Sequence, residues 1–306
     1  MKFSLVIPVA PYRNAEILGS IAKLDFPKKE YEVIVENGTN PSENRNRGFE
    51  KSRGKVIVLL DDDAVLEEDY LKRVEEFLEA HPEISVVGGP QLTPKNEKGF
   101  AKISGYALSS KFGAWKLSNR YSSQKEILNV DETALTSANL ICRREVMEKV
   151  RFDLNLFPGE DPKFISDAKR EGFKVAYSPK IILYHRRRGT VRELIKQISN
   201  YGKTRPKKEK FSETIKNPFF IFPSLFVLYL ILRPILLLIP IFNKFAVLSS
   251  IPLLLYLLLT LIFTVYDSAK NKDIKAIFIL PFIYPLIHIS YGLGMLKGHM
   301  EKMSRK

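Results

Sequence analysis

Cysteine is nearly absent from this sequence of 306 residues, which contains only Cys142. A single cysteine excludes an intramolecular disulfide and suits a reducing compartment. We expect Cys142 to be a small buried apolar residue. A convincing signal peptide is also lacking, because the apolar run over 1–10 is short and is followed by Pro11 and Arg13. We therefore expect the N-terminal part to stay on the side of the membrane where it is made.

Acidic residues are fewer than basic residues, so the net charge is +14. A basic protein can bind nucleic acid, anionic lipid or phosphorylated substrates. The sequence lacks the interleaved aromatic and basic residues of a nucleic-acid stacking module, so we predict no nucleic-acid partner. Ten Lys and Arg residues and two Glu residues lie between Arg186 and Lys210, directly before an apolar region. That position favours anionic lipid headgroups and phosphates as partners.

Charged residues almost disappear from three segments near the C-terminus, at about 219–241, 245–266 and 274–296. Each has about 22 residues, enough to cross a hydrocarbon core of about 30 Å. The basic block before 219 and the basic tail should both be cytoplasmic, yet three full spans would place them on opposite sides. One segment is therefore re-entrant or interfacial, and the proline-containing first and last segments are the candidates. Arg233 either faces a lipid phosphate or lies near a helix end.

Strand and helix patterns alternate over the first 90 residues. Short β-branched runs at 3–9, 31–35, 55–60 and 84–88 predict strands, and helical spacing of apolar residues predicts helices over 14–24 and 68–80, with a further basic helix over 43–53. This alternation predicts a mostly parallel sheet covered on both faces. Residues 137–150 are predicted to form a strand and a helix, 160–171 a helix, and 174–184 a strand broken at Pro179. Residues 91–136 are irregular and suit acceptor-side loops.

Acidic residues follow two of the predicted strands. Glu36 follows the second strand, and Asp61, Asp62 and Asp63 follow the third. In parallel sheets the chemistry lies just beyond the carboxyl ends of the strands. Carboxylates at Asp61 and Asp63 can hold a hard divalent cation that offsets charge on a nucleotide diphosphate. The alternative is a solvated acidic turn, or an N-cap at Asp63.

Five stretches, read in order, resemble glycosyltransferase family 2, the inverting enzymes with the GT-A fold. They are SLVIPV, EVIVENGT, NRNRG, GKVIVLLDDDA and PGEDPKF, and the resemblance covers residues 3–205. The later stretches 197–205 and HISYGLGML are similar to the membrane-bound branch that makes exopolysaccharides and lipid-linked glycans. The resemblance implies a GT-A α/β domain, with its mostly parallel sheet flanked by helices, followed by a helical transmembrane region.

The same resemblance assigns donor-site roles. The first-strand proline and its loop cradle the nucleotide in the family, which implies this role for Pro8, Val9 and Tyr12. The acid after the second strand reads the base, which points to Glu36 with Asn37, although many members have Asp-Asp-Gly-Ser where this chain has Glu36-Asn37-Gly38-Thr39. Further donor-site residues are Arg45, Asp61 and Asp62. The resemblance assigns the divalent metal, Mn²⁺ or Mg²⁺, to Asp63 with Asp61, and His185 is a candidate metal ligand.

Glu160 and Asp161 correspond to the family's Glu-Asp motif, which implies that Asp161 is the general base. A positioned carboxylate of this kind contributes about 10²–10⁴ in rate, because a neutral sugar hydroxyl is a poor nucleophile. A lipid phosphate acceptor would already be anionic and would need a base less. The alternative for this pair is an acidic helix N-terminus stabilised by the helix dipole.

An amphipathic basic helix over 190–201 carries the remaining candidates. Membrane-bound relatives often have Gln-x-x-Arg-Trp here, whereas this chain has Gln197-Ile198-Ser199-Asn200-Tyr201, so the arginine is missing. Arg205 or Arg186 can bind the diphosphate instead, since guanidinium groups suit phosphate. The helix lies either in the membrane interface or on the surface of the soluble domain.

We therefore predict three regions: a GT-A catalytic domain over 1–189, a basic interfacial helix and linker over 190–217, and a transmembrane region over 218–306. The expected function is sugar transfer from a UDP- or GDP-sugar to a lipid-linked acceptor, either a polyprenyl phosphate or a lipid-linked oligosaccharide. We expect a multi-pass protein of the cell membrane with its catalytic domain in the cytoplasm. The alternative is a catalytically silent partner subunit with the same fold. The sequence gives no prediction of oligomeric state.

Overall fold

The computed structural model describes residues 1–208, 214–215 and 217–304, so part of the predicted linker and the tail residues Arg305 and Lys306 lie outside it. Its contacts divide the chain into two units. The α/β unit comprises Met1–Glu97 and Lys116–Arg186, and the helical unit comprises Lys98–Trp115 and the chain from Arg187 onward.

A six-stranded sheet forms the centre of the α/β unit. Its strands lie in the order β2 (Tyr31–Asn37), β1 (Phe3–Val9), β3 (Val56–Leu60), β7 (Asn139–Arg143), β5 (Val86–Gly88) and β8 (Val175–Tyr177). Only β7 runs antiparallel to its neighbours, β3 and β5. The predicted mostly parallel sheet is therefore confirmed, and β1, β2 and β3 end at the same edge.

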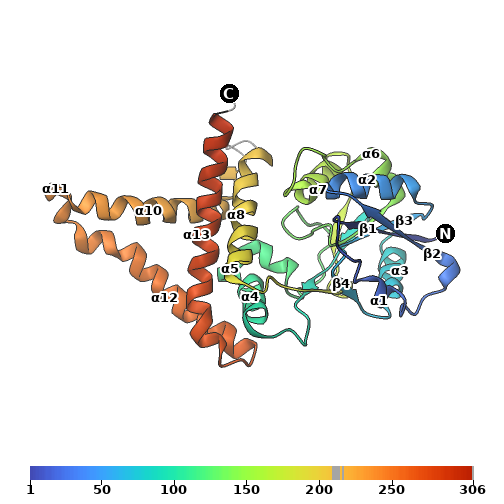
Figure 1. Ribbon diagram of the computed structural model, residues 1–306, viewed down its shortest axis with the longest axis horizontal. Coiled ribbons are helices and arrows are strands. Elements are labelled where there is room, and N and C mark those ends of the chain that lie inside the picture. The colour runs from blue at the N-terminus through green and yellow to red at the C-terminus, as the bar shows by residue number, and fades with distance from the viewer. Residues whose placement is uncertain (209–213, 216, 305–306) are drawn as a thin grey trace. The chain divides into compact units, whose positions relative to one another are not determined.

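Helices cover both faces of this sheet (Figure 1). Along β1, Leu5 and Ile7 pack with α1 (Leu18–Ile21) and α3 (Tyr70–Ala80), whereas Val6 packs on the other face. That second face is covered by α2 (Pro41–Lys51), α6 (Arg144–Lys149) and α7 (Glu160–Arg170). Alternate strand side chains point to opposite faces, so a strand with uninterrupted apolar residues is buried on both.

A smaller sheet lies next to the end of β3. It has the order β4 (Ala64–Leu66), β9 (Leu183–His185) and β6 (Gln91–Leu92). Strands β4 and β9 pair antiparallel, with Ala64 opposite His185. The stretch predicted as one strand broken at Pro179 is thus two strands, β8 and β9, which belong to different sheets.

The helix predicted over 14–24 is the main error in this unit, because α1 has only four residues, Leu18–Ile21. The backbone N–H of Ile17 donates to the carbonyl of Asp62 instead of to a helical acceptor. The chain before it turns sharply, with Tyr12 at a φ of 66°. Apolar spacing predicted which residues are buried, but a tertiary backbone bond shortened the helix.

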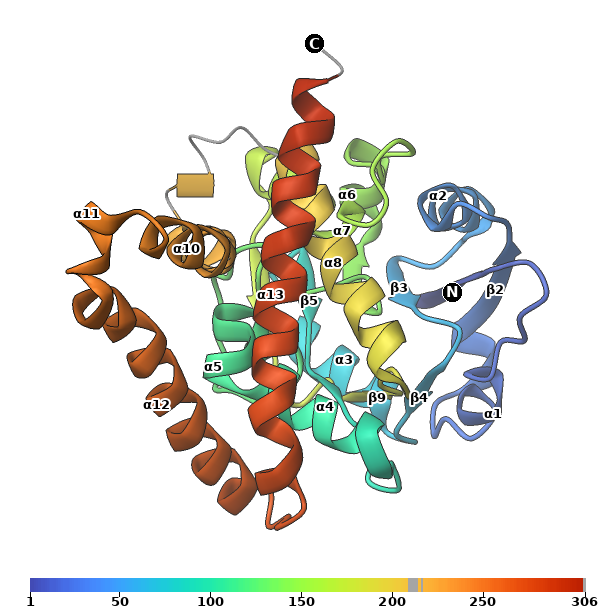
Figure 2. The same cartoon turned by 60° about the vertical axis from the view of Figure 1, so that its left-hand side comes forward.

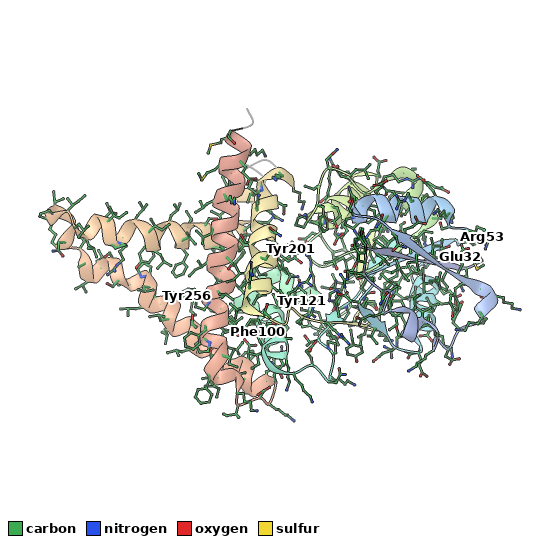
Figure 3. The ribbon with its side chains drawn as sticks, in the orientation of Figure 1. Glu32, Arg53, Phe100, Tyr121, Tyr201 and Tyr256 are labelled. Carbon is green, nitrogen blue, oxygen red and sulfur yellow. The ribbon has the colours of Figure 1, made fainter. Side chains whose placement is uncertain are left out.

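The outer edge of the large sheet carries a compact charged contact, labelled in Figure 3. Glu32 on β2 accepts hydrogen bonds from Ser4 Oγ at 2.7 Å and from the backbone N–H of Arg53 at 2.6 Å. The Arg53 guanidinium donates two more, at 2.9 and 3.0 Å. These bonds tie β2 and β1 to the chain that leaves α2.

The helical unit is built from the elements α4 (Gly99–Ser109), α5 (Lys111–Ala114), α8 (Val191–Lys208), α10 (Phe222–Leu237), α11 (Pro240–Asn243), α12 (Ala246–Lys270) and α13 (Ala276–Met303). Short 3₁₀ turns complete the chain at Lys28–Glu30, Trp115–Arg120 and Pro218–Phe220. Among the described residues, three helices are long and apolar enough to cross a membrane: Pro218–Leu237, Ala246–Lys270 and Ala276–Met303. Figure 2 shows α8 lying beside α13.

Part of the stretch that the sequence left irregular is helical. Helices α4 and α5 pack within the helical unit against α12 and α13. His288 Nε2 on α13 lies 2.9 Å from the carbonyl oxygen of Phe112 on α5, and the Tyr106 hydroxyl on α4 donates at 3.3 Å to Asp273 Oδ2, between α12 and α13. Residues 98–115 are therefore bound to the apolar helices by polar contacts that no local pattern indicates.

Candidate active site

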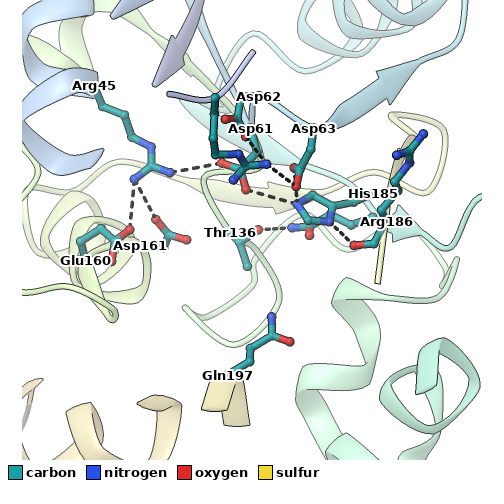
Figure 4. Close-up of polar contacts among 12 residues, drawn as sticks. Arg45, Asp61, Asp62, Asp63, Thr136, Glu160, Asp161, His185, Arg186 and Gln197 are labelled. Carbon is teal, nitrogen blue, oxygen red and sulfur yellow. Dashed lines mark hydrogen bonds and ion pairs between the residues drawn. The ribbon is translucent and has the colours of Figure 1, made fainter. Parts of the chain in front are cut away.

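Asp61, Asp63 and His185 meet where β3 ends and the small sheet begins (Figure 4). Asp63 directly precedes β4, and the β4–β9 ladder places His185 beside it. His185 Nε2 lies 3.1 Å from Asp63 Oδ1 and 3.5 Å from Asp61 Oδ2. One ligand atom from each of the three residues lies within 4.8 Å of the other two. Two carboxylates and one imidazole are a suitable ligand set for a divalent cation.

The His185 ring is held in one orientation. Its Nδ1 lies 2.9 Å from the carbonyl oxygen of Arg186, so Nδ1–H donates there and Nε2 faces the carboxylates. Burial opposes a charge on this ring, but hydrogen bonds with Asp61 and Asp63 outweigh it and raise the pKa of His185 to about 9. The pKa of Asp63 is lowered well below its usual range, since His185 and Arg13 outweigh its burial. A backbone carbonyl bound to the distal ring nitrogen is the usual support of a metal-ligating histidine.

Arg45 joins this cluster to a second pair of acids. Its side chain is only 5 % exposed. One terminal nitrogen lies 3.0 Å from Glu160 Oε1 and 3.9 Å from Asp161 Oδ1, and the other lies 3.3 Å from Asp61 Oδ1. A buried arginine is tolerated only when its charge is paired, and these carboxylates supply that pairing. Arg45 therefore fixes the distance between the end of β3 and the start of α7.

The two acids at the start of α7 have different surroundings. Burial, and then the neighbouring carboxylate of Asp161, raise the pKa of Glu160 to about 8, although Arg45 opposes the change. Glu160 also accepts a hydrogen bond from the backbone N–H of Gly159. Asp161 Oδ1 is buried and accepts no hydrogen bond from any described residue. Glu160 is thus engaged by Arg45 and the Gly159 N–H, whereas Asp161 Oδ1 has no hydrogen-bond donor among the described residues.

Arg13 is a member of this site that the sequence patterns did not single out. Its guanidinium lies 3.1 Å from Asp63 Oδ2 and 3.2 Å from Asp62 Oδ1. Burial raises the pKa of Asp62 to about 6, although the charge of Arg13 opposes this. The signal that could have identified Arg13 is a lone cation in the loop after the first strand, opposite three consecutive acids. Its side chain is half exposed.

The predicted donor-side residues lie at the ends of β1 and β2. Asn44 on α2 holds these ends together, since its amide donates to the carbonyls of Gly38 and Val9 at 3.1 and 3.4 Å. Pro8 and Val9 end β1, and the Tyr12 ring beyond them is fully exposed. The nucleotide-binding role of these residues stays a prediction.

Glu36 is more constrained than the sequence suggests. Its buried carboxylate lies 2.6 Å from Lys51 Nζ and 3.3 Å from Arg47 Nε. Arg47 also donates to the backbone carbonyl of Asn37 at 2.7 Å. Two cations therefore already hold the acid that the family resemblance assigns to base recognition.

The remaining candidates are spread over both units. Arg186 is exposed and lies 3.5 Å from Glu16 in the α/β unit. Gln197, Tyr201 and Arg205 lie on α8 in the helical unit. Gln197 donates to the Tyr201 hydroxyl at 3.0 Å, and the buried Arg205 guanidinium lies 3.4 Å from the centre of the Phe220 ring. Their predicted roles towards diphosphate or acceptor stay predictions.

A comparison with known protein families identifies the family of this chain. The profile described as glycosyltransferase-like family 2 matches residues 5–200. The chain belongs to glycosyltransferase family 2. It is therefore an enzyme that transfers a sugar from a nucleotide-sugar donor.

Individual relatives of this glycosyltransferase agree with the family. A dolichyl N-acetyl-α-D-glucosaminyl phosphate 3-β-D-2,3-diacetamido-2,3-dideoxy-β-D-glucuronosyltransferase of Methanococcus voltae is 23 % identical over 315 residues, which cover 90 % of each chain. The mannosyltransferase PcManGT of Pyrobaculum calidifontis, solved with GDP-Man and Mn²⁺, superposes with a TM-score of 0.55 at 13 % identity, covering 98 % of this chain and 88 % of that one. S. aureus TarS 1–349 with UDP gives 0.50 at 16 % identity, covering 98 % and 92 %. These structures share the GT-A fold with the glycosyltransferase described here.

Proposed function

We propose that this glycosyltransferase transfers a sugar from a UDP- or GDP-sugar to a hydroxyl group of a lipid-linked saccharide, at the cytoplasmic face of a membrane and with a divalent metal. The observation that carries the proposal is the link through Arg45 between a candidate metal-ligand cluster and a carboxylate oxygen that accepts no hydrogen bond from a described residue. Asp61, Asp63 and His185 form the cluster, and the oxygen is Oδ1 of Asp161, 3.9 Å from Arg45. Metal-assisted donor binding and proton removal from an acceptor need these two parts close together.

Asp61, Asp63 and His185 fit the metal that the family resemblance implies. The three side chains are partly buried, and Nε2 of His185 lies 3.1 Å from Asp63 Oδ1 and 3.5 Å from Asp61 Oδ2. Mn²⁺ or Mg²⁺ bound there would neutralise charge on the leaving nucleotide diphosphate. PcManGT, whose structure contains Mn²⁺, supports this choice of ion. Arg13 would turn from Asp62 and Asp63 towards the diphosphate, since guanidinium groups suit phosphate oxygens.

Asp161 is the proposed base. Its Oδ1 is buried and without a hydrogen-bond donor among the residues that the structure describes, while Glu160 is occupied by Arg45 and the Gly159 N–H. A carboxylate in this state accepts the proton of a sugar hydroxyl as the bond to the anomeric carbon forms. An acceptor that is already a phosphate anion would not use it. The free oxygen thus favours a hydroxyl acceptor over a polyprenyl phosphate.

The nucleotide would lie along the ends of β1 and β2. Pro8 and Val9 would line the base pocket, and the exposed Tyr12 ring would stack on the base. Asp61 and Asp62 would face the ribose, and Arg45 would keep them in place. Glu36 and Asn37 would read the base edge, with Lys51 and Arg47 fixing the Glu36 carboxylate.

The lipid carrier of the acceptor is proposed from two observations. The Methanococcus voltae relative is named for a dolichyl-linked sugar phosphate, and three helices of this chain are long and apolar enough to cross a membrane. The basic residues before the first of these helices would bind anionic headgroups on the cytoplasmic side. Gln197, Tyr201, Arg205 and Arg186 would contact the diphosphate or the acceptor.

The direct test is a transfer assay with the full-length protein in lipid nanodiscs. Purified protein is mixed with Mn²⁺, a set of UDP- and GDP-sugars, and either a polyprenyl phosphate or a polyprenyl-linked N-acetylhexosamine, and products are separated by mass spectrometry. The proposal predicts one added sugar on the saccharide and none on the bare phosphate. Addition to the bare phosphate alone would overturn the proposed acceptor.

A further inference from the structure

Helices α8 and α13 touch backbone to backbone along much of their length. A Cβ atom at Gly294 would lie 2.1 Å from the carbonyl oxygen of Ser199, and one at Gly298 would lie 2.2 Å from that of Lys203. Gly202 meets the carbonyl of Tyr291 in the same way. Ser199 and Lys203 lie four residues apart, as do Gly294 and Gly298, so the two helices run parallel. Glycine permits this approach because it has no side chain, and the pairing is close and continuous.

This pairing places charges beside the middle of α13. The register set by Ser199–Gly294 and Lys203–Gly298 brings Lys196 level with Tyr291 and Arg192 level with Ile287. Arg192, Glu193 and Lys196 are all exposed on α8. If α13 crossed the bilayer, its partner α8 would bring these charged groups into the hydrocarbon. Charged side chains at that depth are strongly disfavoured unless they are paired or face water.

Helices α10 and α12, together with the short α11, form a hairpin with a different charge pattern. Between Phe222 and Tyr266 only Arg233 and Lys244 are charged, and Lys244 lies at the tip beside α11. The 22 residues from Phe245 to Tyr266 extend about 33 Å as a helix, which matches a hydrocarbon core of about 30 Å. This apolar segment is followed by five charged residues, Asp267, Lys270, Lys272, Asp273 and Lys275. The hairpin base, at the start of α10 and the end of α12, thus has the charge of a membrane boundary.

Helix α13 lies across this base. Near the start of α10, a Cβ at Gly292 would lie 2.3 Å from the carbonyl oxygen of Pro223, and Ser224 Oγ donates to the Gly292 carbonyl at 3.3 Å. At the end of α12, Asp267 accepts the hydrogen bond from Tyr284. Figure 1 shows α13 running across the hairpin and beside α8. The start of α10 therefore meets α13 at Gly292, and the end of α12 meets it at Tyr284, eight residues earlier.

We infer that α13 lies along the cytoplasmic membrane interface and does not cross the bilayer. The chain then crosses twice, through α10 and α12, and its C-terminal end returns to the side of the catalytic unit. The exposed residues Phe278, Phe282, Leu293 and Met300 recur at helical spacing on α13 and would enter the headgroup–acyl boundary. Lys270, Lys272, Lys275 and Lys297 would bind anionic headgroups. This inference rests on the membrane location given under Proposed function.

The experiment uses an impermeant maleimide on sealed membrane vesicles of known orientation. The native chain is the unlabelled control, because its single cysteine, Cys142, is fully buried. Lys29→Cys reports the catalytic unit, Lys244→Cys the hairpin tip, and Met303→Cys and Ser304→Cys the C-terminal end. We expect the tail cysteines to react in the same vesicles as Lys29→Cys, and Lys244→Cys to react only in vesicles of the opposite orientation.

Two other outcomes are distinguishable. Tail cysteines that react together with Lys244→Cys would show that α13 crosses the bilayer, which overturns this inference and leaves the proposed membrane enzyme intact. A Lys244→Cys that reacts together with Lys29→Cys would show that the hairpin does not cross, which overturns the membrane-spanning premise as well.

A depth measurement decides independently of labelling yield. Spin labels at Phe278, Phe282, Leu293 and Met300 are compared in nanodiscs by their collision rates with oxygen and with a water-soluble nickel complex. Equal depths at all four positions support the interfacial helix. A maximum of depth in the middle of the series would contradict it.

Discussion

His185 Nε2 lies 3.1 Å from Asp63 Oδ1, and the antiparallel pairing of β4 with β9 sets that distance. The two residues are far apart in sequence, and one hydrogen-bonded ladder brings them together. Hydrogen bonds with Asp61 and Asp63 raise the pKa of His185 to about 9, so the ring carries a proton at neutral pH. A divalent ion would replace that proton without any change in the backbone.

Metal binding should release about one proton from His185 at pH 7. Because the pKa of His185 is raised to about 9, the ring is protonated at neutral pH and must lose the proton to bind the ion. The affinity for Mn²⁺ should rise about tenfold per pH unit between pH 6 and 8. Calorimetry in two buffers of different ionisation enthalpy measures the proton release. His185→Gln should remove the pH slope, and an equal slope in both proteins would contradict the assignment.

Asp161→Asn should abolish transfer while donor binding stays within about threefold of the native value. The expected loss is about 10²–10⁴ in kcat, because the amide cannot accept the proton of the acceptor hydroxyl. Glu160→Gln is the matched neighbour, and it should lower the melting temperature more than Asp161→Asn does, since Glu160 pairs with Arg45. Undiminished transfer by Asp161→Asn would point to another base or to an anionic acceptor.

Arg45→Met should destabilise the α/β unit strongly. Three carboxylates contact this guanidinium, and its removal leaves them close together without a counter-charge. Removing one partner from a buried ion pair costs about 3–5 kcal/mol. Chemical unfolding followed by circular dichroism measures the change, and Arg53→Met on the exposed edge is the control. A loss below about 1 kcal/mol would show that Arg45 does not organise the site.

Glu32→Gln should reduce stability at neutral pH by about 1–2 kcal/mol, because the carboxylate accepts hydrogen bonds from Ser4 and Arg53. Burial opposes its charge, but these hydrogen bonds lower the pKa of Glu32 in the folded state. A lowered folded-state pKa gives stability that is fully present above the unfolded-state pKa and is lost as pH falls through the folded-state pKa. The difference between the native protein and the variant should therefore shrink in acid. A constant difference across the titration would contradict this account.

Much of the fold could be predicted from short-range patterns. The β-branched runs of β1 and β3 are apolar at nearly every position, which is typical of strands buried on both faces, whereas the edge strand β2 exposes Val33 and Val35. The acids at the carboxyl ends of β2 and β3 predicted the sheet edge at which the site lies. The length of α1 could not be predicted, because the bond from Ile17 to Asp62 is a tertiary contact.

The candidate site was predicted in part. The run of acids after the third strand indicated Asp61 and Asp63, the family resemblance indicated Asp161, and His185 was a candidate metal ligand. The role of Arg45 as a bridge depends on where α7 begins relative to β3, which no sequence spacing encodes. Arg13 was missed for the same reason, since it lies in an irregular loop. The helical state of residues 98–115 depends on contacts such as Phe112 with His288.

The most direct test of the account is a calorimetric titration of the full-length protein with UDP and with GDP, each with and without Mn²⁺. The account predicts that one nucleotide binds at least tenfold more tightly when Mn²⁺ is present. Asp63→Ala should remove that gain while the protein unfolds at a similar temperature. Equal binding with and without Mn²⁺, or an undiminished gain in Asp63→Ala, would contradict the central claim that Asp61, Asp63 and His185 hold the metal for the donor.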